Sequence, residues 1–265
     1  MNYTGLTGNP RHDQLLALVT SHGYISNEEL AHKLNVTTQT IRRDIRALSQ
    51  QGLVSRHHGG AGKMPNLVNT DFSIRETTHT DEKTLIAQAI SEYIPDGSTI
   101  FITIGTTVEF IAKALEKKNN IRIITNSLHV ANLLYTNKSL EVIVVGGILR
   151  AHNSGIIGPN TTNFISHFRA DYLITSLGAI AEDGSLLDFD INEVATVKTM
   201  MNYSKNIILA VDHSKFFTSA GVELGHIKQV TDIFTNEKPP SAIMKIIKEN
   251  KIKLHITNVI TQKGS

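Results

Sequence analysis

The stretch TTQTIRRDIRALSQQGL, residues 37–53, has the hydrophobic period of an α-helix. Ile41, Ile45 and Leu48 fall at positions i, i+4 and i+7, so their side chains share one face. Thr37 stands just before the first turn, where a hydroxyl can accept a hydrogen bond from a backbone N–H that has no partner inside the helix. We therefore predict a helix that is capped by Thr37 and buries one apolar stripe.

The polar side of this helix suits contact with DNA. Threonine and glutamine in a first turn can hydrogen-bond to base edges, and arginine binds guanine or phosphate. The predicted DNA-contacting residues of the helix are Thr37, Thr38, Gln39, Thr40, Arg42, Arg43 and Arg46. Taken alone, the pattern also fits an ordinary amphipathic helix with a solvated basic face. The neighbouring segments decide between the two interpretations.

Two helical patterns precede this stretch and a wing-like segment follows it. Residues 11–22 have helical periodicity, and Ser26-x-x-Glu29 is a capping box that opens a short second helix. Helix, short helix, turn and helix is the order of a helix-turn-helix domain. Residues 53–60, LVSRHHGG, predict a strand and a basic turn. We predict a winged helix-turn-helix domain over residues 1–60, with further DNA contacts from Arg56, His57 and His58.

Charge is distributed unevenly along the chain. Residues 1–63 hold seven basic and four acidic residues, and the remainder holds nineteen basic and twenty acidic residues. A small basic head on a nearly neutral body suits nucleic-acid binding by the head. Because the excess is modest, a single head should bind DNA weakly. We therefore expect a homo-oligomer, a dimer or a tetramer, on double-stranded operator DNA.

Composition excludes several classes of protein. The chain has no cysteine, which excludes disulfide frameworks and thiolate metal sites. Its twelve histidines are scattered and none forms an HExxH pair, so we predict no metal and no cofactor. Neither a signal peptide nor an apolar run of membrane-spanning length is present in the sequence, and a cytoplasmic location is expected.

From residue 81 onward, β-rich runs alternate with helical segments. The predicted strands are 99–104, 121–125, 141–145, 172–177, 206–211 and 232–235, and the predicted helices lie near 81–93, 107–117, 127–136, 160–168, 192–203 and 240–249. This alternation predicts an α/β domain with a mostly parallel sheet covered on both faces. We place a linker at 61–80, a sensor domain at 81–256 and a tail at 257–265.

Small, hydroxylated or charged residues follow several of these strands. Ligands bind beyond the carboxyl ends of strands in such sheets, and a glycine-led helix start can bind an anion. The predicted effector-binding residues are Thr103, Gly105, Thr106, Thr107, Asn126, Ser127, Gly146, Gly147, Arg150, Asp212 and Lys215. Each alone could belong to a plain turn or a hydrophilic loop. Together they favour a phosphorylated small molecule.

The motif TxxTIRRDI at 37–45, with Arg11 before it and RHHGG at 56–60 after it, resembles the DNA-binding signature of the DeoR family of bacterial transcriptional regulators. The resemblance continues through FITIGTT at 101–107, NSGIIG at 153–158 and VDHSKF at 211–216, and covers about residues 10–255. It implies a repressor whose sensor domain shares the fold of ribose-5-phosphate isomerase and binds a sugar or polyol phosphate. In detail it is closest to the branch that controls glycerol 3-phosphate use, which implies glycerol 3-phosphate as the effector.

Two departures from the family pattern concern carboxylates. The family usually has an acidic residue two positions before the glycine of GTT, where this chain has Thr103, and the segment TSLGAIA at 175–181 lacks the acidic residue that often follows. An isomerase with an accessory DNA-binding head is the enzymatic alternative, and it needs a positioned base. Asp183 and Glu193 are the nearby candidates. A scaffold protein whose head binds another protein is the third interpretation, and the clustered arginines disfavour it.

Overall fold

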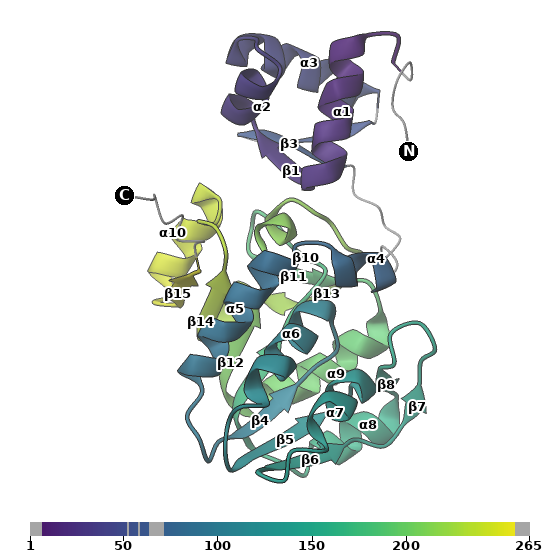
Figure 1. The fold of residues 1–265 in the computed structure, drawn as a ribbon, viewed down its shortest axis with the longest axis vertical. Coiled ribbons are helices and arrows are strands. Elements are labelled where there is room, and N and C mark those ends of the chain that lie inside the picture. The colour runs from purple at the N-terminus through teal and green to yellow at the C-terminus, as the bar shows by residue number, and fades with distance from the viewer. Residues whose placement is uncertain (1–6, 52, 58, 64–71, 258–265) are drawn as a thin grey trace.

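The computed structural model describes residues 7–51, 53–57, 59–63 and 72–257 (Figure 1). We use "head" for the described residues up to 63 and "body" for residues 72–257. In Figure 1 the head lies above the body, and the sheet of the body is flanked by helices. No helix in the described ranges is long and apolar enough to cross a membrane.

The head has the predicted winged helix-turn-helix fold. Its elements are α1 (Pro10–His22), β1 (Tyr24–Ser26), α2 (Asn27–Lys33), α3 (Thr38–Gln50), β2 (Val54–His57) and β3 (Gly60–Lys63). The hydroxyls of Ser26 and Thr37 accept the backbone N–H groups of Glu29 and Thr40, so both predicted caps are confirmed. β1 was not predicted; it pairs with β3 in a sheet of order β1-β3-β2.

A buried carboxylate joins α1 to α3. Asp44 accepts hydrogen bonds from Nε and Nη2 of Arg11 at 2.6 and 3.0 Å, and its Oδ1 lies 3.2 Å from Nε2 of His12. Burial opposes the charge of this carboxylate, but the bonds from Arg11 and His12 hold the pKa of Asp44 below its usual value. Arg11 and Asp44, which stand out in the sequence motif, thus secure the position of α3 in the head.

The body is built on seven parallel strands in the order β15-β14-β12-β9-β4-β5-β6. Their bounds are β4 (Thr99–Ile102), β5 (Ile121–Thr125), β6 (Leu140–Val144), β9 (Ala170–Thr175), β12 (Ser204–Ala210), β14 (Asp232–Thr235) and β15 (Lys253–Ile256). All six predicted runs form strands, and the parallel sheet is confirmed. β15 was not predicted, and it adds an edge strand.

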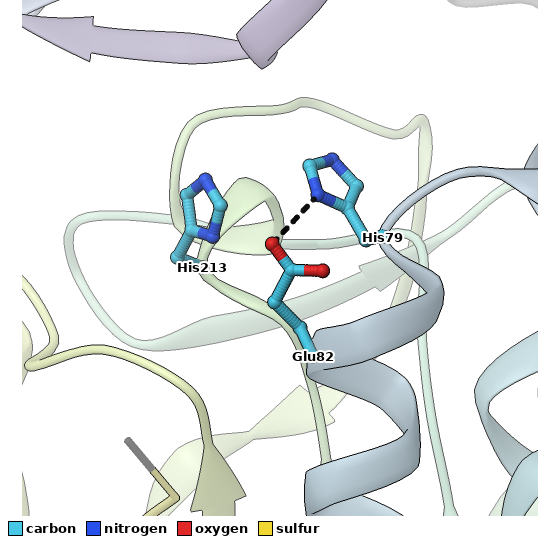
Figure 2. Close-up of side chains that lie close together, drawn as sticks. All are labelled: His79, Glu82 and His213. Atoms are coloured by element: carbon cyan, nitrogen blue, oxygen red, sulfur yellow. Dashed lines mark ion pairs between the residues drawn. The ribbon is translucent and has the colours of Figure 1, made fainter. Parts of the chain in front are cut away.

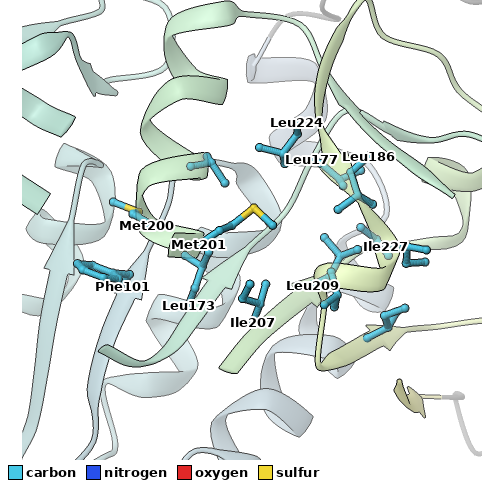
Figure 3. Close-up of a cluster of buried hydrophobic side chains, with 14 of the residues drawn as sticks. Phe101, Leu173, Leu177, Leu186, Met200, Met201, Ile207, Leu209, Leu224 and Ile227 are labelled. Carbon is cyan, nitrogen blue, oxygen red and sulfur yellow. The ribbon is translucent and has the colours of Figure 1, made fainter. Parts of the chain in front are cut away.

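Helices cover both faces of this sheet. They are α5 (Thr80–Tyr93), α6 (Thr106–Leu115), α7 (Leu128–Leu134), α8 (Pro159–Ile165), α9 (Ile191–Asn202) and α10 (Ser241–Glu249). One apolar cluster includes Phe101 and Leu173 from the sheet and Met200 from α9 (Figure 3). A second includes Ile86 and Ile111 from α5 and α6. The strands are therefore buried on both sides, as the apolar runs in the sequence predicted.

Short elements escape the sequence pattern. They are α4 (Phe72–Thr77), β7 (Ile148–Leu149), β8 (Ile156–Ile157), β10 (Ala179–Ile180), β11 (Ser185–Asp188), β13 (Val222–His226) and the 3₁₀ turns η1 (His213–Phe216) and η2 (Ile227–Gln229). Segments of two to six residues are too short to display a clear period, so the sequence pattern does not indicate them. β3 and α4 both extend into the segment predicted as a linker. Residues 258–265 of the predicted tail lie outside the described residues.

The strand order reverses once. From β4 the chain builds outward through β5 and β6, and it then returns to the other side of β4 to add β9, β12, β14 and β15. The loops that follow β4 and β9 diverge to opposite sides and leave a crevice at the carboxyl ends of these two strands. Crevices of this kind are where α/β sheets bind their ligands.

Candidate DNA-binding surface and ligand cavity

The outer face of α3 carries the predicted DNA contacts. Ile41, Ile45 and Leu48 are buried in the head, whereas Gln39, Arg42, Arg43 and Arg46 are exposed and Thr38 and Thr40 are partly exposed. This separation leaves one side of α3 to pack and the other to enter a major groove. Arg56 on β2 is exposed as well. These residues together form a basic surface on the head.

His57 does not share the surface of Arg56. Successive side chains of a strand point to opposite faces, and the ring of His57 lies 5.3 Å from Phe217 of the body and 5.8 Å from Tyr24. Burial lowers the pKa of His57, and its Nε2 has no hydrogen-bond partner among the described residues. The structure therefore favours a role for His57 between head and body, in place of the predicted DNA contact. His58 lies outside the described residues.

An aromatic stack joins the head to the body. The rings of Tyr24 and Phe217 are 3.5 Å apart between centroids and 8° from parallel. The wing approaches closely too, because a Cβ on Gly62 would lie 3.2 Å from the carbonyl oxygen of Phe217. Burial raises the pKa of Tyr24 to about 12. Nothing in the sequence pattern indicates this contact, since the two rings come from separate domains.

A cavity of about 220 Å³ opens at the crevice between β4 and β9. Five of the predicted effector-binding residues line it, namely Gly105, Thr106, Thr107, Asp212 and Lys215. Thr20 and Gly23 of the head also line it, so the cavity lies at the junction of head and body. A molecule bound there would contact elements of both domains.

The first turn of α6 provides a site for an anion in this cavity. Gly105 precedes the helix with a φ of 140°, a conformation that favours glycine, and no side chain caps the helix start. The first-turn N–H groups of α6 therefore depend on water or a ligand for hydrogen bonds. Together with the positive end of the helix dipole, they favour a phosphate or carboxylate.

Cations from three positions surround the cavity. Arg75, Lys83 and Lys215 line it. Burial lowers the pKa of Lys83 to about 8, and its ammonium donates hydrogen bonds to the carbonyl oxygens of Arg75 and Thr78. Lys83 is thus committed to holding the turn between α4 and α5. Lys215 is the cation that the sequence predicted for this site.

Carboxylates line the cavity as well. Asp188 on β11 is partly buried, and burial raises its pKa to about 6. Burial acts in the same direction on Asp212, but Lys215 and His79 outweigh it and lower the pKa of Asp212 to about 2. Glu193, which the sequence suggested as a possible base, accepts hydrogen bonds of 2.7 Å from both Arg150 and Asn153. The cavity thus combines an anion site with acceptors for hydroxyl groups.

The other predicted effector residues lie outside the cavity lining. Thr103 is buried and donates to Oγ1 of Thr175 at 3.1 Å. Asn126 donates to the carbonyl oxygen of Ile156 at 3.2 Å, and Ser127 caps α7. The hydroxyl of Thr103, the amide nitrogen of Asn126 and the hydroxyl of Ser127 thus have partners in the protein, whereas Oδ1 of Asn126 is buried with no hydrogen-bond partner among the described residues. Their place in the structure is to support the loops near the cavity.

The glycine pair and Arg150 also have structural partners. The carbonyl oxygen of Gly146 accepts a hydrogen bond from Thr161, and a Cβ on Gly147 would collide with the same threonine. Arg150 pairs with Glu193 and Asp190, at 2.7 and 3.0 Å. Arg150 therefore acts on the cavity through Glu193. Asp183, the other suggested base, is exposed and lies outside the cavity lining.

Sequence reasoning missed several residues of the cavity. These are Arg75, His79, Lys83, Asn153, Ser176, Asp188, Ser214 and Thr218. Ser176 follows β9 directly, so a search of every strand end would have found it. Asp188 ends the short strand β11 and Thr218 lies in the loop between η1 and β13, and neither segment has a periodic signal. Arg75 and His79 come from the segment that appeared to be a linker.

Two family descriptions match the chain. Residues 11–64 match "DeoR-like helix-turn-helix domain", and residues 78–237 match "DeoR C terminal sensor domain". Both regions coincide with the head and with most of the body.

Curated relatives match nearly the whole chain. The HTH-type transcriptional repressor CsqR of Escherichia coli K12 is 58% identical over 96% of this chain and 97% of its own length. The glycerol-3-phosphate regulon repressor of the same organism is 44% identical over 93% of this chain and 98% of its own length. The expectation that the glycerol 3-phosphate branch is the most similar is therefore wrong, because CsqR shares more residues with this chain.

Solved structures are similar over about half of the chain. A ribose 5-phosphate isomerase from Methanocaldococcus jannaschii covers 52% of this chain and 55% of its own, with a TM-score of 0.40 and 14% identity. RipA from Yersinia pestis covers 60% of this chain and 44% of its own, with a TM-score of 0.42 and 13% identity.

Proposed function

The chain belongs to the DeoR family and is a DNA-binding transcriptional repressor, not an enzyme, and we propose that a phosphorylated polyol or sugar in the ligand cavity releases it from its operator. One observation carries the proposal. The uncapped start of α6 and the ammonium-bearing Lys215 line one cavity, which residues of the head also line. A phosphate there would meet backbone N–H groups and a cation together.

The remaining lining suits the hydroxyl groups of such a ligand. Asp188 and Glu193 offer carboxylate oxygens, and Ser176 and Thr218 offer hydroxyls. Hydroxyl-bearing substrates commonly bind to acceptors of this kind because each buried hydroxyl needs a partner. We propose glycerol 3-phosphate as the first effector to test, on the resemblance in the motifs and on the 44% identical glycerol-3-phosphate regulon repressor. Fructose 6-phosphate is the comparison ligand.

The route from cavity to DNA runs through η1. Lys215 lies in η1, and Phe217, which stacks on Tyr24 of the head, follows at its end. A ligand that draws Lys215 toward α6 would move Phe217 and disturb this stack. Ligand and operator would then favour different placements of the head, so each would weaken the binding of the other to the same degree.

We also propose that the protein binds its operator as a homo-oligomer, with two heads on two half-sites. One head presents a single α3, whereas a helix-turn-helix protein gains affinity by placing two such helices on half-sites about one helical turn apart. A ligand-driven shift of each head would spoil that spacing. Mass measurement in solution at operator-binding concentrations tests the oligomer, since a monomer would contradict this part of the proposal.

The test is fluorescence anisotropy on a labelled operator fragment. We expect glycerol 3-phosphate to release the DNA and glycerol, which lacks the phosphate, to leave it bound. Release by fructose 6-phosphate alone would support the cavity as the effector site and would show that the effector is not glycerol 3-phosphate. Release by neither phosphate, with ligand binding also absent in calorimetry, would refute the proposed function.

A further inference from the structure

Three potential metal ligands meet at the top of the body, below the head. His79 and Glu82 come from the start of α5 and His213 from the start of η1, and one ligand atom of each lies within 4.8 Å of the others (Figure 2). The rings of the two histidines are 5.2 Å apart between centroids and nearly perpendicular. All three residues are partly buried, so an ion from solvent can reach them. Two imidazoles and one carboxylate form a donor set that transition metals prefer.

The pair on α5 already has a suitable spacing. Nδ1 of His79 lies 3.6 Å from Oε1 of Glu82. A tetrahedral metal with bonds of about 2.0–2.2 Å holds its ligand atoms about 3.3–3.6 Å apart. The pair therefore needs no change of backbone to bind an ion. His213 has to approach by roughly 1 Å, which a rotation of its side chain can supply.

The backbone of His79 is unusual. It stands at the N-cap of α5 with φ 53° and ψ 40°, a left-handed conformation that a residue with a Cβ adopts at a cost, and its side chain makes no capping hydrogen bond. The two hydrogen bonds from Lys83 to the carbonyl oxygens of Arg75 and Thr78 hold this turn. The turn thus directs the ring toward Glu82 and His213 instead of toward the helix start. Strain of this kind is found most often at functional sites.

The partners of His213 favour a ligating tautomer. Oδ1 of Asn236 accepts the backbone N–H of His213 at 2.8 Å, which turns Nδ2 of the same amide to Nδ1 of the ring at 3.0 Å. Because an amide nitrogen can only donate, Nδ1 of His213 carries a lone pair. A metal ion would replace the amide hydrogen at this lone pair. Oε1 of Glu237 lies 3.6 Å from the same nitrogen and can supply a fourth ligand.

We propose that His79, Glu82 and His213 form a binding site for one divalent transition-metal ion of the Zn²⁺ or Co²⁺ type, with Glu237 or water completing the coordination. The donor set excludes a preference for Mg²⁺, which requires oxygen ligands in octahedral geometry. The ion would tie η1 to the start of α5 beside Lys215. Of the three ligands only His79 also lines the ligand cavity, and Co²⁺ binding can be measured with no effector present, so the test of this site does not depend on which effector the cavity accepts.

The experiment is a Co²⁺ titration of the untagged full-length protein, followed by the visible absorption of bound Co²⁺ and by equilibrium dialysis. We expect one ion per chain for the wild type, and competition by Zn²⁺ but not by Mg²⁺. His79→Asn keeps a residue that tolerates the left-handed turn and can cap a helix, and His213→Gln changes the other element. Each variant should bind Co²⁺ at least about 10-fold more weakly.

His255→Gln is the matched control, because His255 also pairs with a carboxylate, Asp232 at 3.0 Å, but is not part of the three-ligand cluster. It should bind Co²⁺ like the wild type. Thermal unfolding without metal shows whether each variant is folded. Absence of stoichiometric Co²⁺ binding by the wild type would overturn the proposal, and so would unchanged binding by folded His79→Asn and His213→Gln proteins.

Discussion

The DNA-binding surface of the head and the ligand cavity of the body are assembled in different ways. Most of the surface comes from one helix, α3, whose apolar residues are buried and whose arginines are exposed, and Arg56 of β2 adds to it. The cavity takes its lining from loops after two strands, from η1, from the segment around α4 and from the head. The first can be recognised from a local period, whereas the second exists only when distant segments are packed together.

The charged residues of the DNA-binding surface are exposed to solvent, whereas some of those in the cavity are buried. Arg42, Arg43 and Arg46 are exposed, so their removal should cost little folding free energy. Asp212 and Lys83 are buried, and their charges depend on neighbouring groups or carbonyl oxygens. Substitutions on the surface therefore test DNA recognition alone, whereas substitutions in the cavity need residues that are not essential to packing.

Of the substitutions that test this difference between the surface and the cavity, we expect the largest effect from loss of the Asp44 carboxylate, which holds α3 against α1. Asp44→Ala removes the acceptor of Arg11 and His12, and breaking a buried hydrogen-bonded ion pair should destabilise the head by about 2–3 kcal/mol. Hydrogen exchange in α1 and α3 measures this loss, and operator binding should fall with it. Glu28→Ala, an exposed acidic site in the same domain, is the control. Equal protection from hydrogen exchange in both variants would show that the contact of Asp44 with Arg11 and His12 is dispensable.

Arg43→Ala should weaken operator binding by roughly 10- to 100-fold, the effect of losing one good contact to a base or phosphate. Because Arg43 is exposed, the unfolding midpoint and ligand binding should stay unchanged. Anisotropy on the operator measures the loss. Lys245→Ala, an exposed cation on α10, should have no effect. An Arg43→Ala protein with full affinity would remove this residue from the recognition surface.

Lys215→Gln should weaken binding of a phosphorylated effector by about 10-fold, because it deletes one charge-assisted contact to phosphate. Operator binding in the absence of effector should be retained. Calorimetry with glycerol 3-phosphate gives the affinity, and Lys228→Gln, an exposed lysine outside the cavity lining, is the control. The same loss in both variants would point to general electrostatic attraction in place of a defined site.

Phe217→Ala should weaken the coupling between the ligand cavity and the DNA-binding surface. It removes the stack on Tyr24, a contact of about 0.5–1.5 kcal/mol. We expect effector and operator each to bind, while the effector reduces operator affinity a few-fold less than it does in the wild type. Anisotropy titrations with and without effector measure this coupling. Full coupling in the variant would exclude the stack as the connection.

The smallest effect is a pH dependence from His57. Burial against Phe217 lowers its pKa below 6.5, whereas in the unfolded chain it titrates near 6.5. The unfolded state therefore binds more protons, so this contribution to stability is full above about pH 6.5 and is lost as pH falls through the folded pKa. We expect His57→Phe to reduce the drop in unfolding midpoint between pH 7.5 and pH 5.5. An identical drop in both proteins would contradict this prediction.

The sequence by itself determined the elements with a clear period. Ile41, Ile45 and Leu48 identified α3, the Ser26 and Thr37 hydroxyls marked two helix starts, and six apolar runs located six strands of the sheet. It also identified the start of α6 and Lys215 as parts of one cavity, since carboxyl ends of parallel strands meet at one edge. These features arise from local backbone preferences and from the burial of one face, which neighbouring residues encode.

Only the tertiary structure decided which distant side chains meet. Asp188 and Arg75 reach the cavity, Tyr24 stacks on Phe217, and His79 faces His213, although none of these residues shares a local pattern with its partner. Thr103 and Asn126 stand at strand ends like Gly105, yet their side chains donate hydrogen bonds to Thr175 of β9 and Ile156 of β8. The reason is physical: close packing of whole domains fixes these contacts, and no local period records it.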